Sequence, residues 1–217
     1  MLRPPEAGFR AAAFLVLLAL ISAQYPGPGA QAPRPDALRL FREGKFEEAR
    51  IQCLREIAED PNNIEAYVVL GWTLVAMGRY ADAEAYARRA LEEVRRDPRI
   101  METMGVAAFF LGKNDQALRW FQTYVTVLPE GSRVASSYQH MGEIYIRTSR
   151  WGHADIALRT ALQFEPTNAR WWTRLGYARE MGGDHRYALE AYEAALRINP
   201  RLTDAQLGRE RVLRALR

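Results

Sequence analysis

The stretch Arg170–Pro200, RWWTRLGYAREMGGDHRYALEAYEAALRINP, carries a pattern that recurs upstream in the same chain. The glycines Gly71, Gly105, Gly142 and Gly176 are separated by 34, 37 and 34 residues. Internal periodicity near this length is typical of a solenoid built from repeated structural units. Turn positions and alanines repeat in step with these glycines: Gly44, Gly78, Gly112, Ser149 and Gly183, and Ala49, Ala83, Ala117, Ala154 and Ala188.

Each repeated unit is expected to form two helices. Apolar residues recur at spacings of three and four, as one face of a helix requires. In the last unit Gly182–Gly183 ends the first helix, because glycine adopts the left-handed C-cap conformation at little cost. The second helix is expected over about 186–198, where Asn199–Pro200 stops it. The small residues Gly176 and Ala188 would let the two helices approach closely.

These residues resemble the tetratricopeptide repeat (TPR) family. Trp172-Thr-Arg-Leu175-Gly176 is similar to the W-x-x-L-G element of the repeat, and Ala117–Phe121 to its A-x-x-x-F element. The resemblance covers about residues 36–202, as one partial and four full repeats, and implies an all-α, right-handed α-solenoid. Prolines stand where the family closes each unit: Pro61, Pro98, Pro129, Pro166 and Pro200.

Two places depart from a regular repeat. We expect three extra residues at Glu92–Asp97 and three more near Gly131–Val134, where they would lengthen a helix or a turn. After the last proline, residues 203–217 are expected to form a capping helix with Thr203 as its N-cap, because solenoid ends need a polar outer surface.

The N-terminus has a different composition. Arg3 and Arg10 precede the uninterrupted apolar run 11–21, and a small residue, Ala23, follows it. This order predicts a secretory signal peptide over residues 1–23, with an uncleaved signal anchor as the alternative. Residues 24–35 are rich in proline and glycine and predict an extended linker. The expected location is therefore outside the cytoplasm, in the periplasm or cell envelope, and contact with a membrane is expected only through the N-terminal segment.

Composition excludes some classes of function. The net charge of +4 is small for 217 residues, so nucleic-acid binding is not indicated. The basic residues are nearly all arginine, with lysine only at Lys45 and Lys113. The single cysteine, Cys53, falls on the apolar face of a predicted helix and is expected to be a buried structural thiol.

The sequence gives no indication of an enzyme. His140, His153 and His185 lie in different repeats, without metal-ligand spacing, and are expected to be exposed turn or groove residues. Neither a phosphate-binding loop nor a nucleophile motif is present. We therefore expect no catalytic residues, no metal and no cofactor.

The resemblance implies that the first helix of each repeat lines a concave groove that binds a partner. The aromatic and apolar residues of the N-terminal half predict a contact surface, although some could instead pack between repeats. The arginines of the C-terminal half could clamp a carboxylate, or could pair with Glu143 and Glu180. The candidate partner-binding residues are Trp72, Val75, Phe109, Phe110, Glu143, Arg147, Arg170, Arg174 and Tyr177.

The function predicted from these observations is a non-enzymatic scaffold or adaptor that binds a protein or peptide in the groove. A carrier of a small apolar or anionic ligand is the alternative. Self-association is a further possibility. The first helix of the partial first repeat is expected to be short, so it would leave the second helix of that repeat partly uncovered.

Overall fold

The structure, a computed structural model, describes residues 36–93 and 97–217 as an all-α solenoid, and the predicted fold class is confirmed. The predicted signal peptide and linker lie outside the described residues. Eleven helices make up the described part of the chain: α2 Ala37–Arg42, α3 Phe46–Glu59, α4 Ile64–Ala76, α5 Tyr80–Glu93, α6 Pro98–Phe110, α7 Asn114–Val127, α8 Val134–Arg147, α9 Trp151–Phe164, α10 Ala169–Met181, α11 His185–Ile198 and α12 Thr203–Ala215.

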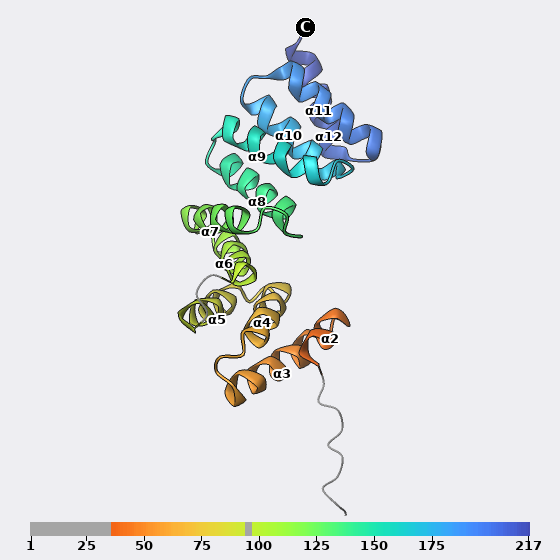
Figure 1. Cartoon of the computed structure of the whole chain (residues 1–217). Helices are drawn as coiled ribbons and strands as arrows, with labels where there is room; N and C mark the ends of the chain where they lie inside the picture. Colours follow the sequence, from red (N-terminus) through yellow and green to blue (C-terminus); the bar gives the residue numbers. More distant parts are fainter. Residues whose placement is uncertain (1–35, 94–96) are drawn as a thin grey trace, which may run out of the picture. The chain divides into compact units, whose positions relative to one another are not determined.

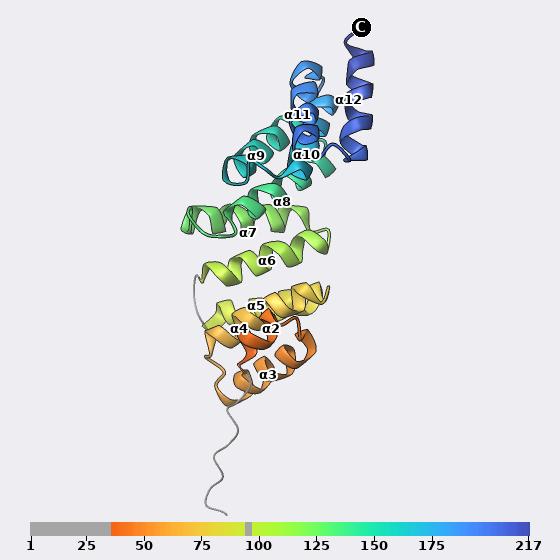
Figure 2. The same cartoon turned by 90° about the vertical axis from the view of Figure 1, so that its right-hand side faces the viewer.

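The helices stack in chain order as antiparallel pairs (Figures 1 and 2). The first helices of successive pairs contact one another along the stack, from α2 through α12 in steps of two. The second helices, α3, α5, α7, α9 and α11, make no such contacts with one another. The first helices are therefore closer together than the second helices, so the row of first helices lies on the inner side of the stack. We call the row α2, α4, α6, α8, α10 and α12 the A face, and the opposite row the B face.

The helix ends follow from local sequence. Asn63, Asp97 and Asn168 cap α4, α6 and α10 with side-chain hydrogen bonds to backbone N–H groups, which would otherwise lack partners. Four of the five repeated turn positions are glycines with φ between 72° and 87°. Ser149 occupies the fifth position with φ 55°. This left-handed backbone conformation has a higher free energy for a residue with a side chain than for glycine. The turn pattern predicted from the sequence is therefore present in each repeat.

Close approach of paired helices depends on the repeated glycines. A methyl group added at Gly105 would lie 2.7 Å from the Phe121 ring, and one at Gly176 would lie 2.8 Å from the Tyr192 ring. Both rings are fully buried. The missing side chains on the first helices thus provide the space that the aromatic rings of the second helices fill, as the sequence predicted.

We expect the same substitution to have opposite effects at two glycines. Gly142→Ala would place a methyl 2.6 Å from Leu158, so the variant should lose about 1–3 kcal/mol of unfolding free energy. Gly152 lies in α9 with open space around it, so Gly152→Ala should gain roughly 0.5 kcal/mol from the better helix former. Urea unfolding followed by circular dichroism measures both, and equal effects at the two sites would contradict this account.

One of the two predicted insertions is wrong. Helices α3, α5 and α7 begin at Phe46, Tyr80 and Asn114, in equal steps of 34 residues, so the unit that contains Glu92–Asp97 holds no extra residues. Pro98 is the first residue of α6, so it does not correspond to Pro61, which lies before α4. The extra residues near Gly131–Val134 are present, since α7 and α8 are joined by the longer connection 128–133.

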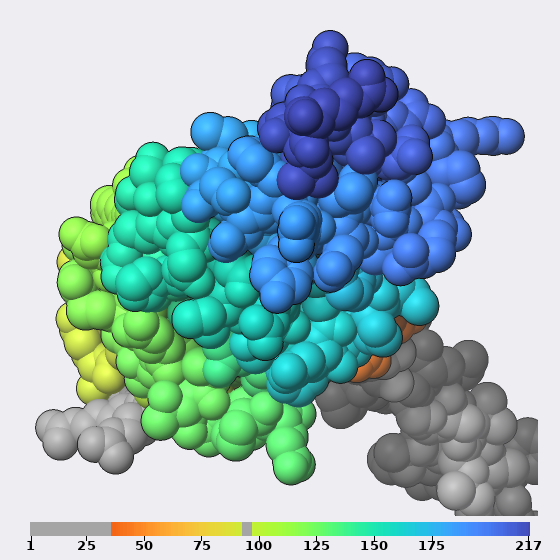
Figure 3. Space-filling model, turned by 90° about the horizontal axis from the view of Figure 1, so that it is seen from above, coloured from red at the N-terminus to blue at the C-terminus, as the bar shows by residue number. Residues whose placement is uncertain are grey.

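The two ends of the described stack differ from the central repeats. Helix α2 is only six residues long, and its N-cap is Asp36. Helix α12 packs on α11 and α10 through Ala205, Gly208 and Val212, and Figure 3 shows it lying over the last repeat. Leu202 is the N-cap of α12, without a side-chain hydrogen bond, so the predicted capping by Thr203 is wrong.

Cys53 is fully buried in α3, as expected, and burial raises the pKa of its thiol to about 12. A thiol that stays protonated and shielded is a packing group rather than a nucleophile. None of the helices between Ala37 and Ala215 is both long and apolar enough to span a membrane.

Candidate interaction face

The candidate site is the A face, where equivalent positions of successive repeats form columns. The first column holds the residue three positions before each repeated turn residue, for example Val75 before Gly78. The second column holds the residue that follows each repeated helix glycine, for example Trp72 after Gly71, and the equivalent position of α12. The column residues change from apolar and aromatic at the N-terminal end to charged at the C-terminal end. The first column is Phe41, Val75, Phe109, Ile146 and Glu180, and the second is Trp72, Val106, Glu143, Tyr177 and Arg211.

The apolar end of the A face is formed by α2, α4 and the end of α6. Phe41 and Trp72 are both half-buried, with ring centroids 6.1 Å apart. Val75 is half-buried beside them. Phe110 is 49% exposed, and its ring stacks on Tyr80 at 4.4 Å. Partly exposed aromatic groups on neighbouring helices form the kind of surface that binds a partner.

Phe109 is not part of this exposed surface. It is 5% exposed and packs edge-on against His140, with the ring centroids 4.7 Å apart. His140 also stacks on Phe121, and its Nδ1 lies 2.7 Å from the Ser136 carbonyl oxygen. The prediction that Phe109 is a contact residue is therefore corrected: it joins α6 to α8 inside the stack. The predicted exposure of His140 is wrong for the same reason, and burial lowers the pKa of its imidazole.

The charged end of the A face contains paired arginines. Arg174 donates two hydrogen bonds, of 2.8 and 2.7 Å, to the carboxylate of Glu143 in the preceding repeat. The Arg174 guanidinium also lies 5.2 Å from the centre of the Tyr177 ring. Two of the predicted binding residues thus pair with each other, which was the alternative left open from the sequence. The pair joins α8 to α10.

The other two predicted arginines differ from Arg174. Arg147 covers the Phe109 ring at 4.0 Å and donates a hydrogen bond of 3.3 Å to the Phe109 carbonyl oxygen. Arg170 is exposed at the start of α10. Because neither forms an ion pair among the described residues, Arg147 and Arg170 retain charge that a partner can use.

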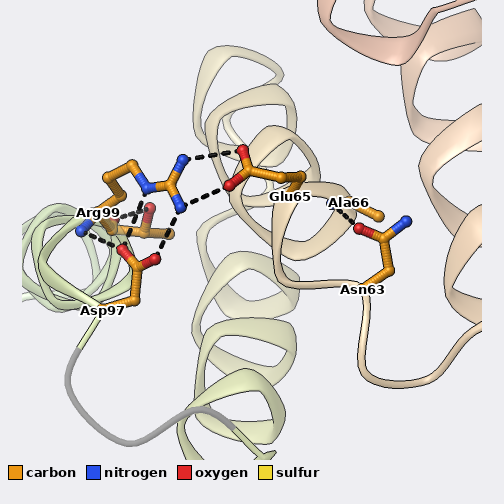
Figure 4. A network of polar contacts seen from close by, with 6 residues as sticks. Asn63, Glu65, Ala66, Asp97 and Arg99 are labelled. Atoms are coloured by element: carbon orange, nitrogen blue, oxygen red, sulfur yellow. Dashed lines mark hydrogen bonds and ion pairs between the residues drawn. The ribbon is translucent and has the colours of Figure 1, made fainter.

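Arg99 forms a similar bridge between repeats at the N-terminal end (Figure 4). Its guanidinium donates two hydrogen bonds of 2.8 Å to Glu65, 34 residues earlier, and others to Asp97, the N-cap of its own helix. The neighbouring N-cap, Asn63, binds the N–H of Ala66 at the start of α4. Exposed ion pairs contribute little stability each, so the main effect of this network is to fix the positions of α4 and α6.

Sequence analysis missed two residues of the site, Phe41 and Arg211. Arg211, from α12, donates hydrogen bonds of 2.7 and 2.8 Å to Glu180, which also accepts one of 2.6 Å from the Tyr192 hydroxyl. Burial alone would raise the pKa of Glu180, but the hydrogen bonds from Arg211 and Tyr192 lower it. Both residues belong to the columns described above, so extending the repeat alignment into α2 and α12 would have found them.

Glu102 is a buried carboxyl on α6. It is 9% exposed, and burial raises its pKa to about 6, opposed only by the charge of Arg133. The Tyr124 hydroxyl lies in the same region and accepts a hydrogen bond from the Arg133 N–H. Nothing in the sequence signals the burial of Glu102, which lies near Arg133 at the end of the longer connection 128–133.

Stacked helix pairs with a variable inner face define an α-solenoid of helical-hairpin repeats. The chain belongs to the tetratricopeptide repeat family, whose models match residues 40–102 and 141–202, together more than half of the chain.

Two curated relatives share part of this chain. The BBSome complex member BBS4 homolog of Drosophila melanogaster is 30% identical in an alignment of 136 residues that covers 58% of this chain and 28% of that protein. The human Tetratricopeptide repeat protein 7B is 25% identical over 124 residues, which are 57% of this chain and 14% of that protein. The chain therefore spans less than a third of either relative.

Solved structures show the same fold at lower identity. MamA from Desulfovibrio magneticus RS-1 is 19% identical, with a TM-score of 0.68 over 77% of this chain and 93% of that one. YrrB, described as a TPR protein with an unusual peptide-binding site, is 18% identical, with a TM-score of 0.67 over 80% of this chain and 88% of that one. At these identities the likeness shows the fold.

Proposed function

We propose that this protein is a non-enzymatic scaffold that binds a peptide or an extended protein segment on its A face. The observation that carries the proposal is the exposed Phe110 ring of α6, stacked on Tyr80 at the start of α5, together with the Trp72 and Phe41 rings that pack against each other on α4 and α2. Aromatic rings bury large apolar areas when a partner covers them. The description of YrrB as a peptide-binding TPR protein supports the same use of the fold.

The charged end of the A face would set the register of the bound segment. Glu143 and Glu180 already neutralise Arg174 and Arg211, so these pairs stiffen the face. Arg147 and Arg170 are then the arginines that remain for an acidic group of the partner. The proposed partner therefore combines apolar side chains at one end with a carboxylate at the other.

The proposed setting is the cell envelope. Its support is the N-terminal sequence, in which Arg3 and Arg10 precede the apolar run 11–21. Fractionation of cells that produce the chain with a C-terminal tag tests this setting. Recovery of the tag in the cytoplasmic fraction would overturn it without affecting the proposed binding.

We expect Phe110→Ala to weaken peptide binding at least ten-fold, because it removes the exposed anchor of the apolar end. The probe is a peptide selected from a random library against the purified chain, titrated by isothermal calorimetry. Phe164→Ala is the matched control, since Phe164 is similarly exposed, at 51%, but lies on the B face. Unchanged affinity in Phe110→Ala, or an equal loss in Phe164→Ala, would contradict A-face binding.

A carrier of a small apolar or anionic ligand is the second candidate. A cavity of about 240 Å³ lies between α10 and α12, lined in part by Arg174, Tyr177 and Arg211. It lies slightly below the range of about 300–1,000 Å³ common for small-molecule sites. Native mass spectrometry of the purified chain separates the two candidates, because a carrier retains a bound molecule that Arg211→Ala releases.

A further inference from the structure

The B face has a feature that the proposed function does not use. A cavity of about 220 Å³ opens between α7 and α9, and we call it the B-face cleft. Tyr138 and Met141 of α8 line it, with Val125 on the α7 side and Ile156 on the α9 side. The side chains are mainly apolar, and the cleft is large enough to accept one aliphatic side chain.

The helices beside the cleft carry unusually little charge. Helix α7 has only Asp115 and Arg119, and α9 has only Asp155 and Arg159, whereas α3 and α5 have six charged residues each. The two charges within each helix have opposite sign. This surface therefore lacks the charge that normally keeps an outer solenoid face solvated, and the cores of protein interfaces are depleted of charge in the same way.

Ile156 protrudes beside the cleft. It is 65% exposed, more than any other large apolar side chain in the described part of the chain. The equivalent positions of the other second helices hold Ile51, Ala85, Arg119 and Glu190. A glutamate at the same position of α11 shows that this site in the repeat does not require an apolar residue for folding.

We propose that the α7–α9 surface joins two copies of this chain, with Ile156 of each copy inserted into the B-face cleft of the other. A protruding apolar residue beside a matching apolar cleft makes the surface complementary to itself, which a two-fold symmetric contact requires. The balanced charges on α7 and α9 are also needed, because two identical charged surfaces repel. A stable dimer buries about 1,200–2,000 Å², so the contact extends along both helices beyond the cleft.

Dimerisation through the B face would leave both A faces available. A scaffold with two binding faces engages a repeated or dimeric partner with an avidity that exceeds the affinity of a single face. The inference therefore adds a bivalent arrangement to the scaffold and does not depend on which partner the A face binds.

The test compares Ile156→Glu with the matched control Ile51→Glu in the full-length chain. Ile51 occupies the equivalent position of α3 and is 48% exposed. Sedimentation equilibrium over a range of concentrations should show dimers for the unmodified chain and for Ile51→Glu. Ile156→Glu should raise the dimer dissociation constant at least ten-fold. Monomers of the unmodified chain, or equal behaviour of the two variants, would overturn the proposal.

A complementary pair of variants tests the geometry. Thr126 lines the cleft and is exposed on α7, so Thr126→Arg should block entry of Ile156 and also abolish the dimer. A mixture of Thr126→Arg with Ile156→Glu should associate again, because the new carboxylate meets the new guanidinium across one half of the contact. Failure of the mixture to associate would overturn insertion of residue 156 into the cleft, even if each variant alone is monomeric.

Discussion

Replacing Tyr192 by alanine is expected to lower the free energy of unfolding by about 3–5 kcal/mol, the range for loss of a buried aromatic side chain. Tyr192 is 1% exposed and its ring fills the space beside two glycines, Gly176 of α10 and Gly208 of α12. Its hydroxyl also binds Glu180, which Arg211 holds from α12. A single side chain therefore joins three helices at the C-terminal end of the stack.

Urea unfolding followed by circular dichroism measures this loss, and hydrogen exchange in α11 and α12 shows where it acts. Tyr192→Phe is the control: it keeps the ring and removes only the hydrogen bond to a charged group, so it should cost about 1.5–3 kcal/mol. An equal loss of unfolding free energy in both variants would mean that the hydroxyl, and not the ring, stabilises the C-terminal end of the stack. Unchanged protection of α12 in Tyr192→Ala would contradict the role in joining the helices.

Much of the fold could be predicted because the signals are local and repeated. The helix predicted over about 186–198 agrees with α11, His185–Ile198, since glycine turns and prolines mark the ends of each unit. The insertion at Glu92–Asp97 was wrong because proline serves both before a helix and as its first residue. Sequence alone did not distinguish Pro61, before α4, from Pro98, the first residue of α6.

The site was less predictable because it depends on how each helix is rotated. Phe109 and Phe110 are neighbours about 100° apart on α6, and His140 of α8 lies nearer to Phe109, at 4.7 Å, than to Phe110, at 6.3 Å. Phe109 is therefore buried, whereas Phe110 stays 49% exposed. The partner of Arg174 is 31 residues away, so the pairing depends on the rotation between repeats. Periodicity predicted which positions face inward, but the packing of the next repeat decides which of them remain accessible.

Replacing Glu102 by glutamine is expected to raise the free energy of unfolding by about 2 kcal/mol at pH 7.5. The folded-state pKa of Glu102, about 6, lies above its ordinary value of 4.5, so burial disfavours the charged form. The folded state holds the proton more tightly than the unfolded state, so the stability that this group supports is present below pH 4.5 and is lost as the pH rises through 6. Glutamine keeps the shape and removes the charge.

The stability difference between Glu102→Gln and the unmodified chain should therefore be small at pH 4.5, about a fifth of its full value, and approach its full value above about pH 7. Burial lowers the pKa of His140, so that group destabilises the fold as the pH falls below about 6.5. His140 is present in both proteins, so its effect cancels in the difference. Glu210→Gln, at an exposed position of α12, is the control and should change little. A difference for Glu102→Gln that stays constant between pH 4.5 and 7.5 would show that the carboxyl is not held in its neutral form by burial, and that Arg133 and the connection 128–133 compensate its charge.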